Sequence, residues 1–212
     1  MRFLCFHGKG MNAQIFEKQT ARLRQAVGGG HEFIFINGTI PTEPAPGLES
    51  SIEMPRSWVS EDLTQQRALH DGVVEFIMTQ GPFDGLMGFS QGGGVAASAL
   101  VEDARHRAGH FKCAIFLCAA PPIDPGLIRI GVSRTMDVAT DGVVINIPTA
   151  HIWSDAGDVC PGMGKQLVRM CNEDLRDEFV HQLGHDVPGS LSDEGLAGAV
   201  RVIERAIERA KC

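Results

Sequence analysis

A serine in a glycine-rich segment is the first residue that could do chemistry. Residues 88–92 have the sequence G-F-S-Q-G, which matches the pattern G-x-S-x-G. An apolar run over 84–89 precedes Ser90, and an Ala- and Gly-rich helical pattern over 91–104 follows it. A strand, a tight turn with a serine and a helix make a nucleophile elbow. A phosphate-binding turn would need G-x-G-x-x-G or a Walker lysine, and the segment has neither. The spacing therefore predicts a nucleophilic Ser90.

A serine hydroxyl is a weak nucleophile near pH 7 and needs a base. In folds with this elbow, the partners follow in the order Ser, Asp or Glu, His. His185 lies after the last apolar run, within Leu-Gly-His-Asp-Val-Pro, and is the expected base. The acid is expected in the loop after the apolar run 150–153. Asp158 is favoured there, and Asp155 remains the alternative.

Acyl chemistry at Ser90 would also need donors for a developing oxyanion. The expected donors are two backbone N–H groups, that of Gln91 at the helix start and that of Lys9 after the first apolar run. His7, in the same loop as Lys9, is interpreted as a structural residue. Three large apolar side chains could line a substrate pocket or equally pack in the core: Trp58, Met54 and Phe16.

Short apolar runs alternate with helical patterns along the chain. The runs expected as strands are 3–6, 33–36, 84–89, 113–118, 150–153 and 178–181. The helical patterns cover 13–27, 61–80, 91–104, 162–175 and 193–210, the last with Ser192 as N-cap. Apolar strands separated by helices are typical of a mostly parallel sheet covered on both faces. The fold class is therefore α/β, with functional loops at the carboxyl ends of the strands.

Two segments interrupt this alternation, 38–60 and 119–147, and both are rich in Pro or Gly. Each follows a predicted strand at the carboxyl edge of the sheet. They are candidates for the walls of a pocket, with plain surface connections as the alternative. The length of 212 residues predicts one domain over 1–212.

Composition excludes several function classes. The net charge is −7 without a basic block, and Tyr is absent, so nucleic-acid binding is disfavoured. The start of the chain has no signal-peptide pattern, and no apolar run is long enough to span a membrane. We therefore expect a soluble, cytoplasmic protein. Six Cys without a CxxC pair indicate reduced thiols and no structural zinc site, and no metal or organic cofactor is implied.

Four motifs give the chain a resemblance to a known family. They are F-H-G-K-G at 6–10, R-S-W at 56–58, the run 81–92 that contains Ser90, and G-H-D-V-P at 184–188. With these motifs the whole chain resembles the fungal-type serine hydrolases of the α/β-hydrolase superfamily. This group includes the yeast family serine hydrolases and the human ovarian-cancer-associated hydrolase.

The resemblance implies an α/β-hydrolase fold with a small loop lid and a Ser-His-Asp triad. Ser90 and His185 match the family motif directly, whereas the family's Asp position corresponds to Gly157, one residue before Asp158. Some family members are stand-alone thioesterases that release a polyketide from a carrier protein. The implied function is hydrolysis of an acyl thioester or ester, with an acyl carrier protein or polyketide synthase as partner. The alternatives are a short-chain carboxylesterase, a non-catalytic binding protein, and transfer of the acyl group to an internal nucleophile.

Overall fold

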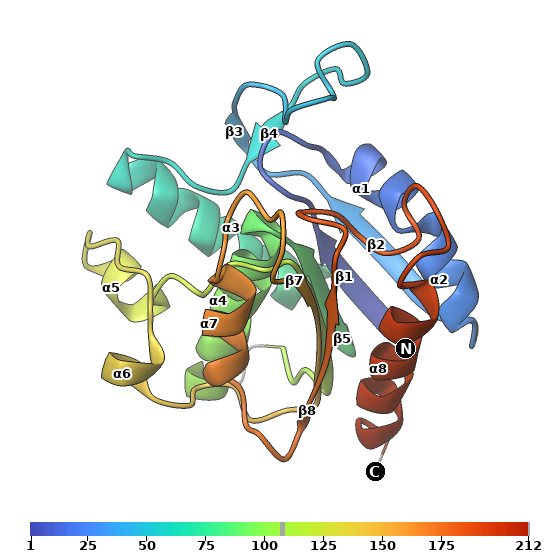
Figure 1. Ribbon diagram of the computed structural model, residues 1–212. Coiled ribbons are helices and arrows are strands. Elements are labelled where there is room, and N and C mark those ends of the chain that lie inside the picture. Colours follow the sequence, from blue (N-terminus) through green and yellow to red (C-terminus); the bar gives the residue numbers. More distant parts are fainter. Residues whose placement is uncertain (107–108, 212) are drawn as a thin grey trace.

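Parallel strands form the centre of the fold. In residues 1–106 and 109–211, the part of the chain that this computed structural model describes, six strands make one sheet in the order β2-β1-β5-β6-β7-β8 (Figure 1). Every pairing within it is parallel. The strands are β1 (Arg2–Phe6), β2 (Glu32–Ile36), β5 (Gly85–Phe89), β6 (Cys113–Leu117), β7 (Thr149–Ser154) and β8 (Arg176–His181). The prediction of a mostly parallel α/β sheet is confirmed.

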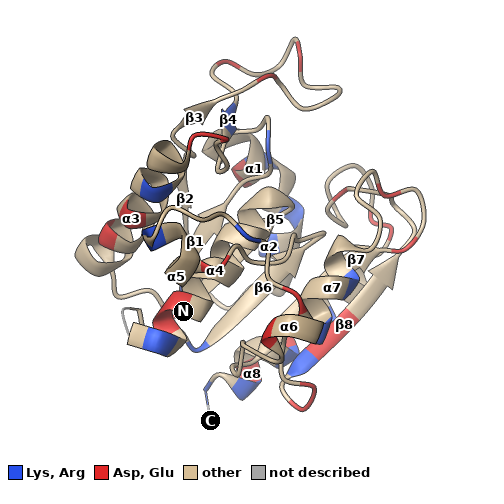
Figure 2. Cartoon of the chain, turned by 90° about the vertical axis from the view of Figure 1, so that its left-hand side faces the viewer, with Lys and Arg blue, Asp and Glu red and all other residues tan. Residues whose placement is uncertain are grey.

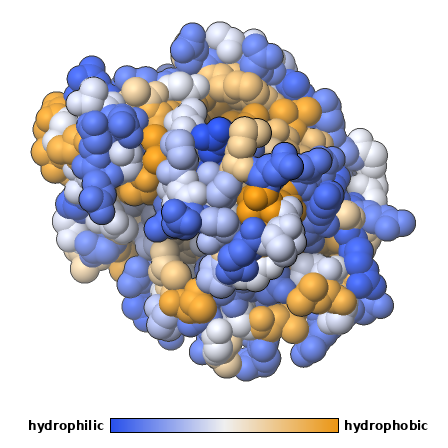
Figure 3. All heavy atoms as spheres, turned by 90° about the horizontal axis from the view of Figure 1, so that it is seen from above, coloured by the Kyte–Doolittle hydropathy of each residue, from blue (hydrophilic) through white to orange (hydrophobic). Residues whose placement is uncertain are grey.

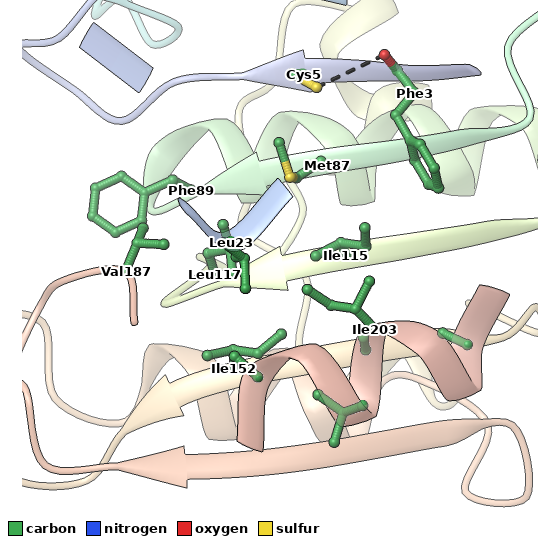
Figure 4. Packing of buried hydrophobic residues seen from close by; sticks show 14 of the residues in the cluster. Phe3, Cys5, Leu23, Met87, Phe89, Ile115, Leu117, Ile152, Val187 and Ile203 are labelled. Carbon is green, nitrogen blue, oxygen red and sulfur yellow. Dashed lines mark hydrogen bonds between the residues drawn. The ribbon is translucent and has the colours of Figure 1, made fainter. Parts of the chain in front are cut away.

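Helices cover both faces of this sheet. Successive strand residues point to opposite faces, so β1 sends Phe3 and Cys5 into one core and Leu4 and Phe6 into the other. The first core, shown in Figure 4, is closed by α1 (Ala13–Gln19), α2 (Ala21–Val27) and α8 (Leu196–Arg209). The second is closed by α3 (Leu63–Gln80), α4 (Gln91–His106) and α7 (Met163–Arg169). Both faces of β5 and β6 are buried, which explains their unbroken apolar runs.

Two helical predictions were too long. The pattern over 13–27 forms two helices that divide at Thr20, whose hydroxyl donates a hydrogen bond to the Phe16 carbonyl. The pattern over 162–175 ends as α7 at Arg169. Beyond it, the chain leaves the helix to pair with the segment before β7, because the backbone N–H of Asn172 donates to the Ile145 carbonyl.

The prediction for the start of the C-terminal helix was also wrong. Helix α8 begins at Leu196, and Gly195 at φ +70° is its N-cap. Ser192 lies before the helix, where its hydroxyl accepts a hydrogen bond from the Glu194 N–H. Asp193 forms an ion pair with Arg22 on α2. Residues 192–194 therefore lie before the first helical turn, and Asp193 contacts α2.

The two irregular segments contain short elements that the sequence patterns did not indicate. Segment 38–60 forms the antiparallel ribbon of β3 (Ile40–Pro41) and β4 (Arg56–Ser57), at the top of Figure 1. Segment 119–147 contains α5 (Pro125–Arg129) and α6 (Val138–Asp141). The N-caps of these two helices are Asp124 and Asp137, whose carboxylates accept hydrogen bonds from first-turn N–H groups. Both segments follow strands at the carboxyl edge of the sheet.

The surface carries charges of both signs, and the described cysteines are free thiols. Lys and Arg are interspersed with Asp and Glu on the side shown in Figure 2. No helix in the described part of the chain is long and apolar enough to cross a membrane. Cys5, Cys113, Cys118, Cys160 and Cys171 are free thiols within the described residues. Cys212 lies outside the described residues.

Candidate active site

Ser90 lies in a tight turn between β5 and α4. Its φ is +53°, in the left-handed region that is unfavourable for a residue with a side chain. The turn is possible because two flanking glycines leave room for strand and helix. A Cβ at Gly88 would lie 2.5 Å from the Gly92 carbonyl oxygen, and one at Gly92 would lie 2.2 Å from that of Phe6. The structure thus has the strand, turn and helix of a nucleophile elbow.

Ser90 is hydrogen-bonded to an imidazole from the far end of the chain. Its Oγ lies 2.8 Å from Nε2 of His185, and Nδ1 of His185 lies 2.7 Å from Oδ1 of Asp158. Both the His185 and the Asp158 side chains are largely buried. Three residues distant in sequence therefore form one hydrogen-bonded chain, at the carboxyl ends of β5, β7 and β8.

The competing carboxylate lies elsewhere. Asp155 is exposed and accepts a hydrogen bond from Nε2 of Gln182 at 2.9 Å. Asp158 also accepts one from the Cys160 N–H at 2.7 Å, which fixes its carboxylate within the loop. Of the two sequence candidates, the structure places Asp158 against the imidazole.

The loop that carries His185 is anchored on both sides. Asp186 accepts hydrogen bonds from the Val187 N–H and from the Ser190 hydroxyl, and Val187 is fully buried beside Phe89 (Figure 4). The Phe89 ring lies 5.1 Å from the His185 ring, centroid to centroid. The H-D-V-P motif therefore orients the imidazole as well as supplying it.

Cys118 is a neighbour of this site that the sequence analysis did not single out. It follows β6 at φ +43°, and its Sγ lies 3.5 Å from the Asp186 carbonyl oxygen. Burial raises the pKa of this thiol to about 12, so it stays protonated and can donate to that carbonyl. The only sequence signal for this contact is the position of Cys118 at the carboxyl end of a strand.

The two residues expected to supply backbone donors, Lys9 and Gln91, lie at the same cavity. Ser90 lines this cavity with them. In residues 1–106 and 109–211, the backbone N–H groups of Lys9 and Gln91 donate no hydrogen bond to another protein group. The Gln91 side chain holds the neighbouring segment, because its Oε1 accepts from the Trp58 N–H at 2.8 Å. Within the described residues, both backbone amides therefore keep an unused donor.

His7 connects the Lys9 loop to segment 38–60. Its Nδ1 donates to the Gly8 carbonyl at 2.7 Å, and its Nε2 accepts from the Gly38 N–H at 3.0 Å. Burial lowers the pKa of His7 to about 4, so the ring is neutral and can accept this bond. Nε1 of Trp58 donates to the His7 carbonyl at 2.8 Å. The position fits the interpretation of His7 as a structural residue.

A cavity of about 440 Å³ opens beside Ser90. Its walls are α3, α4, the 119–135 stretch and the start of α7, and most lining groups are apolar. Seen from above, the face where the loops gather exposes hydrophobic side chains among hydrophilic ones (Figure 3). The volume falls within the range of small-molecule pockets, about 300–1,000 Å³.

One of the three predicted lining residues is in this cavity and two are not. Trp58 lines it, with its ring packed on Phe6. Phe16 is fully buried in the core against Phe35, because α1 turns this side chain toward the sheet. Met54 is 70% exposed and borders a separate polar groove next to α1. The expectation that Met54 and Phe16 line the pocket is corrected accordingly.

The site contains one donor set with the spacing of a metal site. Ligand atoms of Cys118, Asp158 and His185 all lie within 4.8 Å of one another. Both nitrogens of His185 are engaged by Ser90 and Asp158, and the Cys118 thiol is protonated. A metal ligand would have to be a thiolate and a free imidazole nitrogen. The donor set fits the hydrogen-bonded chain better than it fits a metal.

Comparisons with known proteins agree with this geometry. The model of the family described as Serine hydrolase (FSH1) matches residues 1–195. The esterase FPY3 of Fusarium mangiferae is 32% identical over 216 residues, covering 99% of this chain and 98% of that protein. The esterase FUS5 of Gibberella moniliformis is 31% identical over 222 residues, covering 98% and 89%.

Solved structures show the same fold at low sequence identity. A carboxylesterase from Mesorhizobium loti superposes with a TM-score of 0.60 at 15% identity, covering 98% of this chain and 88% of that one. Acyl-protein thioesterase 2 from Zea mays superposes with a TM-score of 0.58 at 17% identity, covering 95% and 93%. The fold is that of the α/β hydrolases. The elbow and the match over 1–195 together show that the chain is a serine hydrolase and belongs to the Serine hydrolase (FSH1) family.

Proposed function

We propose that the chain hydrolyses an acyl thioester or ester through a triad of Ser90, His185 and Asp158. The observation that carries the proposal is the continuous hydrogen-bonded chain beside the cavity, with 2.8 Å from serine to imidazole and 2.7 Å from imidazole to carboxylate. Nucleophile, base and orienting acid in this order are the minimum for covalent acyl transfer.

The proposed reaction has two halves. Ser90 Oγ attacks the acyl carbonyl while His185 Nε2 takes its proton, and Asp158 holds the Nδ1–H tautomer and stabilises the imidazolium. The tetrahedral intermediate collapses, His185 returns the proton to the leaving thiol or alcohol, and an ester on Ser90 remains. Water activated by His185 then hydrolyses this acyl-enzyme and regenerates the free serine.

The oxyanion of each tetrahedral intermediate is proposed to bind to the backbone N–H groups of Lys9 and Gln91. Their lack of a protein partner within the described residues supports this role. Such amides are fixed before the reaction, so they stabilise developing charge without reorganising. The Lys9 side chain is exposed and takes no part in this binding.

We further propose that the whole chain works as one domain, with segments 38–60 and 119–147 as a small lid over the acyl chain. The first supplies Trp58 to the cavity wall, and the second supplies Pro121, Ile123 and Ile128. Both leave strands at the carboxyl edge, where the reacting groups meet.

The proposed substrate is a polyketide or related acyl chain on the phosphopantetheine arm of a carrier protein. The mainly apolar cavity supports an acyl chain, and the resemblance to stand-alone thioesterases supports the thioester. A general short-chain carboxylesterase is the second candidate. The relatives' printed names favour it, since FPY3 and FUS5 are called esterases.

The test compares leaving groups on one acyl chain. Purified protein is given acyl N-acetylcysteamine thioesters and the matched p-nitrophenyl esters, beside Ser90→Ala, with free acid and free thiol measured. Preferred turnover of thioesters that disappears in Ser90→Ala is the expected result. Turnover of oxygen esters alone would select the carboxylesterase. Turnover that persists in Ser90→Ala would exclude the triad.

A second readout separates an enzyme from a binding protein of the same fold. A fluorophosphonate reacts only with an activated serine, so wild type should be labelled at Ser90 and Ser90→Ala should not. An unlabelled wild type without turnover would contradict the proposed function. Product analysis by mass spectrometry would reveal a cyclised product instead of a free acid.

A further inference from the structure

One imidazole in the cavity wall has a buried nitrogen that makes no hydrogen bond within the described part of the chain. His70, on α3, lines the cavity, and 7% of its surface is exposed. Its Nε2 is sealed from solvent and makes no hydrogen bond within residues 1–106 and 109–211. Nδ1 is not among the sealed, unpartnered atoms of the described residues. Burying a polar group without a partner is unfavourable, so the unsatisfied Nε2 sets His70 apart from the rest of the cavity wall.

Four other polar side chains that line the cavity away from Ser90 are hydrogen-bonded or solvated. Ser98 donates to the Gly94 carbonyl and accepts from the Ile123 N–H. Gln66 donates to the Trp58 carbonyl and accepts from the Ser60 N–H, with each bond closing a local turn. Ser133 and Thr135 are exposed and therefore solvated. His70 differs from these groups because it is buried and its Nε2 has no hydrogen-bond partner within the described residues.

Glu102 decides which nitrogen of His70 carries the proton. Oε2 of Glu102 lies 3.9 Å from His70 Nε2, is buried and has no hydrogen-bond partner, whereas Oε1 is held by Arg129. A nearby carboxylate favours the tautomer with the proton on the facing nitrogen. Burial lowers the pKa of His70, so the ring is neutral near pH 7. With Nε2–H toward Glu102, Nδ1 carries a lone pair and is an acceptor.

His70 lies beside the end of α4 that is far from Ser90. Glu102 is three turns of α4 beyond Gln91, about 16 Å along the axis at 1.5 Å per residue. Between them α4 presents Val95 and Ala99 to the cavity, and α3 adds Val73. An acyl chain that leaves Ser90 along α4 would cross this apolar wall before it reaches His70.

We propose that His70 forms a polar subsite at the distal end of the acyl cavity and that it accepts a hydrogen bond from a hydroxyl group on the acyl chain. The proposal rests on the proposed function and narrows its substrate class. The substrate is a hydroxylated acyl chain with an apolar stretch between the carbonyl and the hydroxyl. A saturated, unsubstituted chain would leave Nδ1 without a partner.

The first experiment uses the unmodified protein. A series of straight-chain N-acetylcysteamine thioesters of one length carries a hydroxyl at successive positions, with the unsubstituted chain as reference. We expect kcat/KM to peak for a distal hydroxyl at on the order of 10-fold above the reference, the effect of one buried hydrogen bond. No preference at any position would overturn the proposal.

The second experiment removes the polar subsite by mutation. His70→Phe keeps a ring and removes both nitrogens, so the ratio of hydroxylated to unsubstituted chain should fall to near one. Val74→Ala is the matched control, because it lines the cavity from α3 and carries no polar group. It should change kcat/KM for both chains by the same factor. A preference that survives His70→Phe would overturn the proposal.

A third variant tests the tautomer. In Glu102→Gln the amide can keep its oxygen on Arg129 and turn its NH₂ toward His70 Nε2, which moves the imidazole proton to Nδ1. Preference should then shift from the hydroxylated chain toward a chain with a ketone at the same position. An unchanged hydroxyl preference would overturn the role of Glu102.

Binding to Ser90→Ala keeps this inference separate from the proposed function. The free acids of the hydroxylated and unsubstituted chains are titrated into Ser90→Ala by calorimetry, with no turnover required. Tighter binding of the hydroxylated acid that is lost on adding His70→Phe would support the subsite even if Ser90 proved not to be the nucleophile. Equal binding of the two acids would overturn the subsite, even with full thioesterase activity in wild type.

Discussion

Single residues at this site keep conformations that the surrounding backbone enforces. Ser90 has φ +53°, and a strained backbone of this kind costs about 1–3 kcal/mol. It persists because its N–H donates to the Leu117 carbonyl and its carbonyl accepts from the Ala120 N–H. Both partners belong to β6 and the residues after it, so the neighbouring strand holds the serine in place. The strained turn fixes the position of the Ser90 hydroxyl before a substrate binds.

Replacing the proposed triad carboxylate should affect turnover more than structure. In Asp158→Asn the amide can still contact His185 Nδ1. Its NH₂ group favours the tautomer with the proton on Nε2, and that nitrogen then cannot accept the proton of Ser90. We expect kcat to fall by up to about 10⁴-fold, while the thermal midpoint stays close to that of wild type. Steady-state hydrolysis of the best substrate and thermal unfolding measure the two effects.

Asp155→Asn is the matched control for this prediction. Its carboxylate is exposed and accepts from Gln182, so kcat should remain near that of wild type. The opposite pattern, with loss in Asp155→Asn and normal turnover in Asp158→Asn, would reverse the assignment of the acid.

The site residues that could be predicted from the sequence are those that lie in short local motifs. Ser90 and His185 lie in short patterns whose roles depend on chain order and on neighbouring elements. Whether Phe16 or His70 faces a cavity depends instead on how helices from distant segments pack. Both lie on apolar stripes of helices, where a core position and a lining position have the same pattern. Only the tertiary structure shows that Phe16 packs in the core and that His70 lines the cavity.

At the scale of elements, α4 packs unusually close to the sheet. A Cβ at Gly92 would lie 2.2 Å from the Phe6 carbonyl oxygen and 2.4 Å from that of His7. These are backbone atoms of β1 and of the loop that follows it, so they cannot move without distorting the backbone. Gln91 directly precedes Gly92, so α4 begins beside the loop that follows β1.

Gly92→Ala should therefore destabilise the protein and impair the site together. Overpacking of this kind costs about 1–3 kcal/mol, and we expect the upper end because both neighbours are backbone. The Lys9 loop must shift to admit the methyl group, so kcat should fall as well. Denaturant unfolding and steady-state hydrolysis of one ester measure these effects.

Gly72→Ala provides the control within another helix. Gly72 lies in α3, and a Cβ there meets nothing within 4 Å. Alanine should raise the free energy of unfolding by about 0.5–1 kcal/mol through helix propensity alone. Equal effects of the two substitutions would show that α4 does not rely on close packing at Gly92.

The longer elements were predictable and the shorter ones were not. Apolar runs and helical periodicity located the six strands of the main sheet and the long helices, because burial on one or both faces imposes those patterns. Helices α5 and α6 span five and four residues in a segment rich in Pro and Gly. They depend on the caps at Asp124 and Asp137 and on packing with other elements. Such short helices leave no periodic pattern.

At the scale of the whole molecule, buried neutral imidazoles link stability to pH. Burial lowers the pKa of His7 to about 4 and that of His151 to about 3. In the unfolded chain each would titrate near 6.5. Below that pH the unfolded state takes up protons that the folded state excludes. Stability therefore falls as the pH drops from 7 toward 4.

The free energy of unfolding should accordingly decrease by about 2 kcal/mol per buried imidazole between pH 7 and pH 5, a window above the ordinary pKa of Asp and Glu. His151→Phe keeps a ring that can stack on Phe116, now 5.1 Å away between centroids, and it removes one titrating group. Its loss of stability over this window should be smaller than that of wild type by the same amount.

His110→Asn is the control. His110 is exposed and at φ +56°, a conformation that Asn tolerates, so the stability of this variant should change with pH as that of wild type does. Denaturant titrations at pH 7, 6 and 5 give the slopes. Parallel profiles for wild type and His151→Phe would mean that His151 takes up a proton in the folded protein. That outcome would contradict the lowered pKa that follows from its burial beside Phe116 and Thr149.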